Sequence, residues 1–549
     1  MFEEKIKEII QKSTKLKKAD IRLEKPKNNF GDFAFPCFIL ARTLKKNPVE
    51  IAKDLKSKLK TDSTIEKIEN VGGYLNFFVN KEKFIEESLK NIEKKPKTKK
   101  EVILIESPGP NTNKPLHVGH LRNLFIADSI ARIFEYLGNN VKRVDIVNDR
   151  GIHICKSMLA YQKFGKNKKP DKKSDHFVGD FYVKYAQELK KNPKLEREAK
   201  EMLKEWEKGN PEVISLWKLM NKWAIEGMKE TYKLLNFTHD KSYKESETYK
   251  KGREIVMKGL KEGLFEKKDN AVIINLGKEL GDKVLIRSDG TTVYVTQDIY
   301  LAKKRYEDYK FDKMIYVVAN EQDYHFKVLF KILKILKFKW AEKLIHLSYG
   351  MVNLPSGKMK SREGTVIDAD NLIQEVKEDS STELKKRYNL NKKDLDKRSL
   401  AIALSAIKFA LLKVDTKKDI LFNKEEALDF EGFSGPYLQY AYARACSILE
   451  KTKSKNKINY KNLKEEEFNL VKKLLLFQEN VKRASRDLKP DILVNYTYEL
   501  AKIFNEFYRE CPVLHAKEEQ PRRLLLVETF KKIMNSCLNL LGIEALEKM

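Results

Sequence analysis

The first part of the chain combines two hydrophobic patterns in a short length. Residues 1–20 are polar with apolar side chains at helical spacing, whereas residues 73–80 (GYLNFFVN) have the dense aromatic and aliphatic pattern of a strand. The basic run KKPKTKK at residues 94–100 is typical of a linker. The pattern therefore predicts a small α+β domain over residues 1–96.

After this run, apolar strands alternate with helices. VILI at residues 102–105 is a continuous apolar run, as in a strand that is buried on both faces. Residues 116–137 have helical spacing and end at Gly138. Further strand patterns follow at residues 141–147, 314–319 and 344–352, and a helix reaches residue 336. The alternation predicts a parallel, doubly wound sheet over residues 97–395, with ligands beyond the carboxyl ends of the strands.

Two other segments are mostly helical. Residues 161–265 are charged and contain Trp206, Trp217 and Trp223, so we predict a helical insertion into the sheet domain. Residues 396–549 are almost entirely helical, which predicts a helical bundle.

The chain is strongly basic. Its 110 Lys and Arg against 80 Asp and Glu give a net charge of +30, which favours a polyanionic partner such as a nucleic acid. A lysine-rich proteome would produce the same charge. The N-terminal segment is too charged for a secretion signal, and no apolar run could span a bilayer. We expect a cytoplasmic protein that does not enter membranes.

The five cysteines are scattered and form no CxxC pair. We therefore expect neither a disulfide framework nor a structural zinc site.

The strongest chemical signal is HVGH, which contains His117, Gly119 and His120. It lies where the first buried strand passes into a helix, so a phosphate could bind at the helix N-terminus. The histidines are three residues apart and could face one triphosphate, while Gly119 would let an adenine ring approach the backbone. The alternatives are two unliganded histidines or part of a metal site. We find no further ligand cluster nearby and predict no metal.

A second motif, KMKSR at residues 358–362, follows the last predicted strand between glycines. A loop with these cations could close over a pyrophosphate leaving group, although most basic loops are simply solvated.

Together, HVGH and KMKSR resemble the two ATP-handling motifs of class I aminoacyl-tRNA synthetases. The flanking residues resemble arginyl-tRNA synthetases in particular. The strings that carry this resemblance are NFGDFAFPCFILA, SPGPNTNKPLHVGHLRN, YVTQD, NEQDYHF and EGFSGPYLQYAYARACSIL. It extends over nearly the whole chain.

The resemblance implies an architecture and an activity. The fold would be a Rossmann-type class I catalytic core (97–395, with the insertion at about 161–265), preceded by an N-terminal α+β domain that contacts the tRNA elbow (1–96) and followed by a helical anticodon-binding bundle (396–549). The enzyme would be an arginine–tRNA ligase that uses ATP with Mg²⁺ to join L-arginine to tRNA(Arg), and we expect a monomer.

It also implies a set of site residues. For ATP binding and catalysis these are Lys114, His117, Gly119, His120, Met351, Val352, Lys358 and Lys360. For arginine they are Glu106, Asn111, Tyr294, Asp298 and Gln322. For tRNA we add three tyrosines at the start of the predicted bundle, because anticodon bases often stack on aromatic side chains. They are Tyr437, Tyr440 and Tyr442, and their alternative role is ordinary helix packing. Carboxylates and an aromatic face suit a planar, permanently charged guanidinium.

This chain departs from the family pattern at Ser361, where most class I synthetases have a second lysine. We hypothesise that Lys114 supplies the missing charge. Three alternatives compete with the arginyl assignment: a class I synthetase for another amino acid, a small-molecule cytidylyltransferase, and a catalytically silent tRNA-binding relative. Scattered cysteines argue against a cysteinyl enzyme and the pocket carboxylates against a glutamyl or glutaminyl one, whereas a lysyl enzyme remains open on charge alone.

Overall fold

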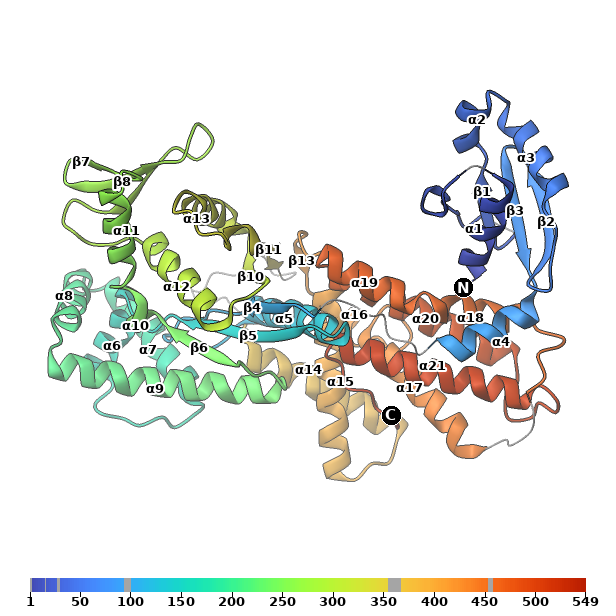
Figure 1. Ribbon diagram of the computed structural model, residues 1–549. Coiled ribbons are helices and arrows are strands. Elements are labelled where there is room, and N and C mark those ends of the chain that lie inside the picture. Colours follow the sequence, from blue (N-terminus) through green and yellow to red (C-terminus); the bar gives the residue numbers. More distant parts are fainter. Residues whose placement is uncertain (1, 15, 27–29, 93–99, 354–366, 453–457) are drawn as a thin grey trace. The chain divides into compact units, whose positions relative to one another are not determined.

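The computed structural model describes residues 2–14, 16–26, 30–92, 100–353, 367–452 and 458–549. The chain divides into two compact units (Figure 1). One contains Met1–Lys95, Arg444–Gln478 and Glu499–Met534, and the other contains Pro96–Ala443, Glu479–Tyr498 and Asn535–Met549.

The second unit is built on the predicted parallel sheet. Its strand order is β11 (Leu344–Tyr349), β10 (Lys313–Ala319), β4 (Val102–Glu106), β5 (Asn140–Val147) and β6 (Lys241–Lys244), and every neighbouring pair is parallel. The strands predicted around residues 102–105, 141–147 and 314–319 are confirmed. The predicted strand at 344–352 is broken by Gly350 and Met351 into β11 and β12 (Val352–Asn353).

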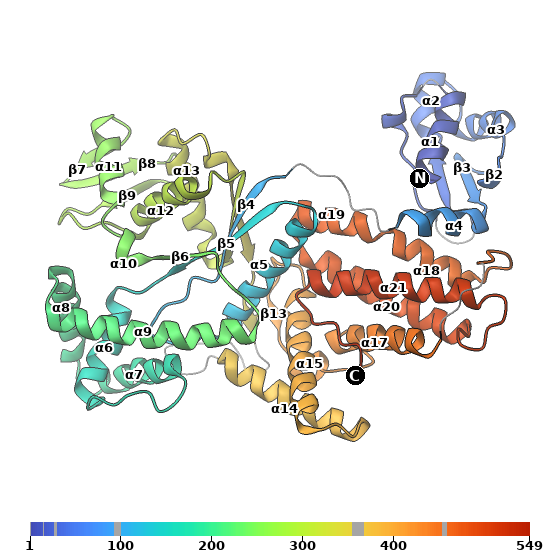
Figure 2. The same cartoon turned by 60° about the horizontal axis from the view of Figure 1, so that its bottom comes forward.

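The sheet is doubly wound about β4. Helix α5 (Val118–Tyr136) joins β4 to β5, whereas α13 (Asp323–Ile335) joins β10 to β11 in the opposite direction along the sheet. Since such crossovers are right-handed, α5 and α13 cover opposite faces (Figure 2). The direction reverses between β4 and β10, so a ligand is expected beyond the carboxyl ends of these two strands.

Helix α12 (Tyr294–Tyr309) shares a face of the sheet with α13. Ile299 from α12 and Leu329 from α13 belong to one buried hydrophobic cluster with Leu104 of β4 and Tyr316 of β10. The packing fixes the first turn of α12 near the edge at which β4 and β10 end.

The segment predicted as a helical insertion contains helices with a buried aromatic core. They are α6 (Ile152–Phe164), which begins before the predicted segment, α7 (Ser174–Leu189), α8 (Lys194–Lys208) and α9 (Pro211–Leu234). The chain returns to the main sheet at β6, inside the range 161–265. This strand has a polar sequence, KSYK, with only Tyr243 buried, as suits a short edge strand and gives little sequence signal. The domain limits given above stay a prediction.

The remaining elements of this part of the chain are short or lie after residue 366. They are α10 (Glu245–Thr248), α11 (Gly252–Lys261), an antiparallel sheet of β7 (Glu266–Lys268), β8 (Ala271–Asn275) and β9 (Asp282–Ile286), the 3-10 turns η2 (Asn320–Gln322) and η3 (Ala341–Lys343), α14 (Ala369–Arg387), α15 (Lys392–Leu412), β13 (Ile420–Leu421) and α16 (Lys424–Ala427). The C-terminal helices, predicted as a bundle, are α17 (Gly435–Lys451), α18 (Glu465–Leu475), α19 (Phe477–Asp487), α20 (Pro490–Glu510) and α21 (Gln520–Leu540).

The first unit contains the predicted N-terminal α+β fold. An antiparallel sheet of β1 (Phe33–Pro36), β3 (Tyr74–Val79) and β2 (Ile65–Val71) packs its fully buried Phe35 and Phe77 against neighbouring helices. The other elements here are α1 (Phe2–Ser13), η1 (Lys18–Asp20), α2 (Phe38–Leu44), α3 (Pro48–Lys58) and α4 (Lys81–Asn91).

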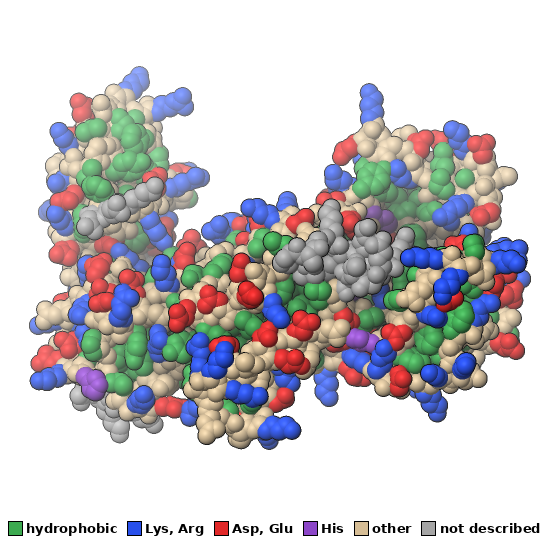
Figure 3. All heavy atoms as spheres, turned by 180° about the vertical axis from the view of Figure 1, so that it is seen from behind, with side chains coloured by type: hydrophobic (Ala, Val, Ile, Leu, Met, Phe, Trp, Pro, Cys, Tyr) green, Lys and Arg blue, Asp and Glu red, His purple; other side chains and the backbone are tan. Residues whose placement is uncertain are grey.

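Lys and Arg side chains are distributed widely over the surface. On the face drawn in Figure 3 they are interspersed with Asp and Glu rather than gathered into one patch. Among the described residues, none of the helices combines the length and the apolar composition needed to cross a bilayer.

Candidate active site

The HVGH motif forms the turn from which α5 begins. His117 is the N-cap residue in extended conformation, and its backbone N–H donates to Nδ1 of His120 at 3.1 Å. The two imidazole rings stack with centroids 3.8 Å apart. A Cβ on residue 119 would lie 3.1 Å from Nδ1 and Cε1 of His117. Gly119 therefore leaves room for the His117 ring, which would have to shift by a few tenths of an ångström if this residue carried a Cβ, a constraint that the sequence did not reveal.

Both histidines are neutral at physiological pH. Burial, and then the charge of Lys114, lower the pKa of His117 to about 3, and burial lowers the pKa of His120 well below its usual range. Since Nδ1 of His120 accepts a hydrogen bond, the neutral ring carries its proton on Nε2. His120 can thus donate a hydrogen bond to an anion without bringing a full positive charge.

Lys114 lies beside this pair. It lines a cavity of 170 Å³ with His117, and residues of α7 and the chain before α14 complete the wall. Burial lowers the pKa of the Lys114 ammonium. A half-buried amine without a carboxylate partner among the described residues is suited to meet a phosphate, because an anion would offset its desolvation.

The second motif, with Lys358 and Lys360, lies outside the described residues, as does Ser361. Its two flanks are described, and both are bonded to the HVGH helix. On one side, Arg122 of α5 donates to the carbonyl oxygens of Gly350 and, at 2.8 Å, of Lys418. On the other side, the Val118 N–H donates to the carbonyl of Ile367 at 3.1 Å. Helix α5, which begins in the HVGH motif, thus bonds to the described residues on both sides of the second motif.

Met351 and Val352 differ in their surroundings. Val352 is buried and pairs with Ile420 in the short β12–β13 sheet, whereas Met351 is 38% exposed. The Met351 side chain is therefore the one that can contact a ligand directly.

The predicted arginine residues follow the carboxyl ends of β4 and β10 or start α12. Glu106 ends β4, where it is buried and forms an ion pair with Arg305 of α12. Asp298 is half-buried, and its Oδ2 lies 2.7 Å from Nε2 of His325 on α13. The segment around Tyr294 and Asp298 is helical, as the one-turn spacing requires for the two to share a face.

The other three members of this set are accessible. Tyr294 is 70% exposed at the start of α12, which leaves its ring free to cover a ligand. Asn111 bridges to Asn148 beyond β5, and Gln322 lies in the 3-10 turn that follows β10. All five residues therefore belong to the sheet edge at which a ligand is expected.

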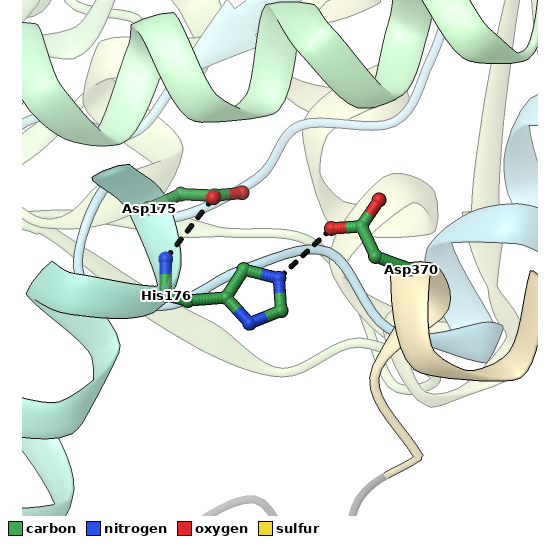
Figure 4. A group of neighbouring side chains, drawn as sticks. All are labelled: Asp175, His176 and Asp370. Atoms are coloured by element: carbon green, nitrogen blue, oxygen red, sulfur yellow. Dashed lines mark hydrogen bonds and ion pairs between the residues drawn. The ribbon is translucent and has the colours of Figure 1, made fainter. Parts of the chain in front are cut away.

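Arg305 and an ionic cluster between α7 and the start of α14 were missed by the motifs, and His325 lies inside the NEQDYHF string but was assigned no role. In the cluster, the His176 Nε2 lies 2.9 Å from Oδ2 of Asp370, and Asp175 is adjacent (Figure 4). These three could hold a metal by their spacing, but Lys173 places its ammonium 2.9 Å from Asp175 and 2.7 Å from Asp370. The carboxylates already bind this ammonium, and we assign no metal to them.

The three tyrosines proposed for tRNA pack within α17 and its neighbours. Tyr442 is only 5% exposed, Tyr437 contacts the ring of Tyr498 at 5.3 Å, and Tyr440 packs against a buried cluster that includes Phe430. Their packing role is thus evident. A base could stack on Tyr442 only if its buried ring became accessible, and the tRNA roles of all three tyrosines stay predictions.

Comparisons with known proteins agree with this geometry. The chain matches the family model for the class I (R) tRNA synthetase catalytic domain at residues 84–424, the arginyl-tRNA synthetase N-terminal domain at 1–79, and the DALR anticodon-binding domain at 438–549. It is 46% identical to an arginine–tRNA ligase of Treponema denticola over 96% of this chain and 95% of the relative. It is 44% identical to an arginine–tRNA ligase of Borrelia hermsii over 99% and 97%.

A solved structure is similar over its full length. The arginyl-tRNA synthetase of Thermus thermophilus has a TM-score of 0.85 at 29% identity and covers 100% of both chains. The resemblance drawn from the motifs is confirmed by these matches. The parallel sheet, the paired histidines at its edge and the full-length relatives together establish that the chain belongs to the arginyl-tRNA synthetase family of class I enzymes.

Proposed function

We propose that this arginine–tRNA ligase activates arginine where β4 and β10 end, with the amino acid and ATP held by two adjacent residue sets. The observation that carries the proposal is the placement of the carboxylates of Glu106 and Asp298 at the sheet edge from which the His117–His120 turn arises. Carboxylates select a guanidinium, and neutral imidazoles at a helix N-terminus suit a polyphosphate.

The arginine set would act by charge and shape. Glu106 and Asp298 hold the guanidinium, and the exposed ring of Tyr294 covers it. The exposed polar groups of Asn111 and Gln322 are available for the amino and carboxylate groups of the substrate. In this proposal the arginine carboxylate faces away from Glu106 and Asp298 and toward the ATP set.

The ATP set would position the triphosphate and stabilise charge as the reaction proceeds. Gly119 and Met351 would contact the nucleoside, with Val352 beneath, while Lys114, His117, His120, Lys358 and Lys360 would contact the phosphates. The arginine carboxylate attacks the α-phosphorus in line, the bond to the β-phosphate oxygen breaks, and pyrophosphate leaves. Since the nucleophile is the substrate itself, the side chains need only orient the groups and donate to the phosphate oxygens.

Mg²⁺ would enter with ATP and neutralise part of its phosphate charge. We assign it no side-chain ligand among the described residues, because the one candidate cluster already holds the Lys173 ammonium. In the second step, a terminal adenosine hydroxyl of tRNA(Arg) attacks the arginyl carbonyl carbon, and AMP leaves. We further propose that the enzyme is cytoplasmic and acts as a monomer, which light scattering after size-exclusion chromatography would test.

The assignment of the amino acid is tested by charging total tRNA with arginine, lysine or glutamate in parallel. Arginine alone should yield aminoacyl-tRNA, because two carboxylates and an aromatic ring match a planar guanidinium better than a compact ammonium. Failure to charge with arginine, or equal charging with lysine, would contradict the proposal.

The hypothesis for Lys114 is tested by Lys114→Ala. We expect single-turnover formation of arginyl-adenylate to fall about 10²-fold, the usual effect of removing one preorganised donor to developing charge. Arginine binding measured by calorimetry should not change. The exposed Lys169→Ala serves as the matched control. The hypothesis is wrong if Lys114→Ala forms arginyl-adenylate at the same rate as Lys169→Ala.

A further inference from the structure

Both carboxylates proposed for the substrate guanidinium already face a cation that belongs to the chain. Glu106 is paired with Arg305, and Asp298 is paired with His325 through a contact of 2.7 Å. A substrate that brings one positive charge therefore enters a pocket whose negative charges are already matched. Binding of the substrate therefore requires that either Arg305 or His325 leaves its carboxylate or loses its charge.

The two cations differ in how firmly they are held. The Arg305 side chain is 1% exposed, and its guanidinium lies over the rings of Tyr243 at 5.2 Å and Tyr316 at 5.7 Å. Burial alone would lower the pKa of Arg305, but the charge of Glu106 raises it, so this residue stays charged. Arg305 is a permanent, enclosed partner of Glu106.

His325 is held less firmly. Its side chain is 28% exposed at the start of α13, and an imidazole can lose its charge near neutral pH. Burial lowers the pKa of His325, and the hydrogen bond and charge of Asp298 more than offset this, so the pKa is raised. The raised pKa depends on Asp298 and would fall if another cation took that carboxylate.

The other titratable groups around this pair lie on separate elements. His346 of β11 faces His325, and burial lowers its pKa, so it adds no charge near neutral pH. Asp323 of α13 lies 3.4 Å from His346. Glu245 of α10 faces Asp298, and burial raises its pKa to about 7, against the charge of Arg150. Glu106 also faces Asp298, but Arg305 offsets its charge.

Charge counting then points to one exchange. With His325 protonated, Glu106, Asp298, Arg305 and His325 sum to zero, and with His325 neutral they sum to −1. A net charge of −1 is the complement of one guanidinium. Keeping two cations on the single carboxylate of Asp298 would be unfavourable in a partly buried site, because like charges repel strongly there.

We propose that His325 is a positioning residue whose imidazolium occupies Asp298 while the pocket is empty, and that the substrate guanidinium displaces it with release of its proton. This inference rests on the proposed role of Asp298 in arginine binding. The imidazolium holds the Asp298 side chain in place through the 2.7 Å contact, so that this half-buried carboxylate has a partner until the substrate arrives.

The exchange makes arginine affinity depend on pH with a defined sign. Below the pKa of His325, binding requires proton loss, so the affinity falls by up to tenfold for each unit that the pH is lowered. Above that pKa the imidazole is already neutral, and the affinity is constant with respect to this group. The arginine guanidinium itself stays charged across this range.

Calorimetric titration of the full-length protein with L-arginine tests the proposal. Between pH 6 and pH 8.5, wild-type affinity should rise with pH. At the lowest pH, the apparent enthalpy should vary among buffers of different ionisation enthalpy by an amount that corresponds to release of nearly one proton. The proton count is measured on the wild-type protein and does not depend on any variant folding.

Substitution separates His325 from the other titrating groups. His325→Gln keeps a hydrogen-bond donor for Asp298 without a charge, so it should abolish most of the pH dependence and bind arginine more tightly than wild type at pH 6. His346→Gln is the matched control on the neighbouring strand and should retain the pH dependence. A thermal melt of each variant confirms folding.

The outcomes separate two failures. If arginine binds but its affinity is independent of pH, or if His325→Gln releases as many protons as wild type, the exchange at His325 is wrong while the proposed function stands. A dependence that His325→Gln retains would point to Glu245 instead and would also overturn the proposal. If arginine binds to no variant at any pH, and tRNA is not charged with it, the proposed function itself fails.

Discussion

The buried pair of Glu106 and Arg305 should govern stability and substrate selection separately. Replacing Glu106 with Gln keeps the size of the side chain and removes its charge. Arg305, which is 1% exposed, would then be left as a buried guanidinium without its carboxylate partner. Breaking a buried ion pair from one side costs about 3–5 kcal/mol, so Glu106→Gln should lower the free energy of unfolding by about that amount.

A compensating substitution shows where the cost arises. In Glu106→Gln/Arg305→Met the stranded charge is gone, and the methionine fills a similar volume between Tyr243 and Tyr316. Apolar replacement of a whole buried pair is often neutral in stability. The double variant should therefore come within about 1–2 kcal/mol of wild type in stability, while arginine activation stays at least about 30-fold reduced because a charged hydrogen-bond acceptor is missing.

Urea unfolding followed by tryptophan fluorescence is the suitable assay. All four tryptophans, Trp206, Trp217, Trp223 and Trp340, belong to the unit that contains the pair. The control is Glu201→Gln, which removes an exposed partner of Arg197 and should leave the transition in place. The reasoning is refuted if Glu106→Gln unfolds at the wild-type urea concentration, or if the double variant is no more stable than the single one.

Two further substitutions follow from the site. Gly119→Ala would place a Cβ 3.1 Å from the His117 ring. ATP–pyrophosphate exchange should therefore fall by about tenfold or more, while the melting temperature changes little. Unaltered exchange would contradict the role of the stacked rings. Asp370→Asn removes a carboxyl whose pKa is held at about 2, since the hydrogen bonds from His176 and Lys173 outweigh the effect of burial. The drop in the pKa of Asp370 from 3.8 to about 2 corresponds to about 2 kcal/mol of folding stability at pH 7. This contribution is lost as the pH falls through the lowered pKa. Stability curves of wild type and Asp370→Asn should therefore converge toward pH 2, and a constant difference would argue against this linkage.

The sequence was most informative where the signal is local. The apolar run before Glu106, the prolines of the loop and Gly138 at the helix end together predict the strand–turn–helix unit that carries His117 and His120, and the structure confirms it. Local patterns work here because each of these signals acts within a few residues of the element that it defines.

Partnerships between distant residues were less predictable. Arg305 lies far along the chain from Glu106, and one basic residue in a charged helix carries no sign of being buried. Asp298 follows Tyr294 by 4 residues and Arg305 follows Asp298 by 7, which places all three near one face of α12, and this was the available signal. Lys173 and Asp370 are likewise far apart in the sequence, and they meet because the start of α7 lies beside the start of α14.

Arg122 is a second buried guanidinium, and its surroundings differ from those of Arg305. Arg122 donates hydrogen bonds to the carbonyl oxygens of Gly350, Thr416 and Lys418. No carboxylate among the described residues forms an ion pair with it. Burial lowers its pKa to about 10, which still leaves it charged at neutral pH. It follows His117 by five residues on α5, about 7.5 Å along the axis. The enzyme therefore keeps a fixed positive potential beneath the turn where a polyanion would bind, and this field requires no ordering of side chains when the polyanion arrives.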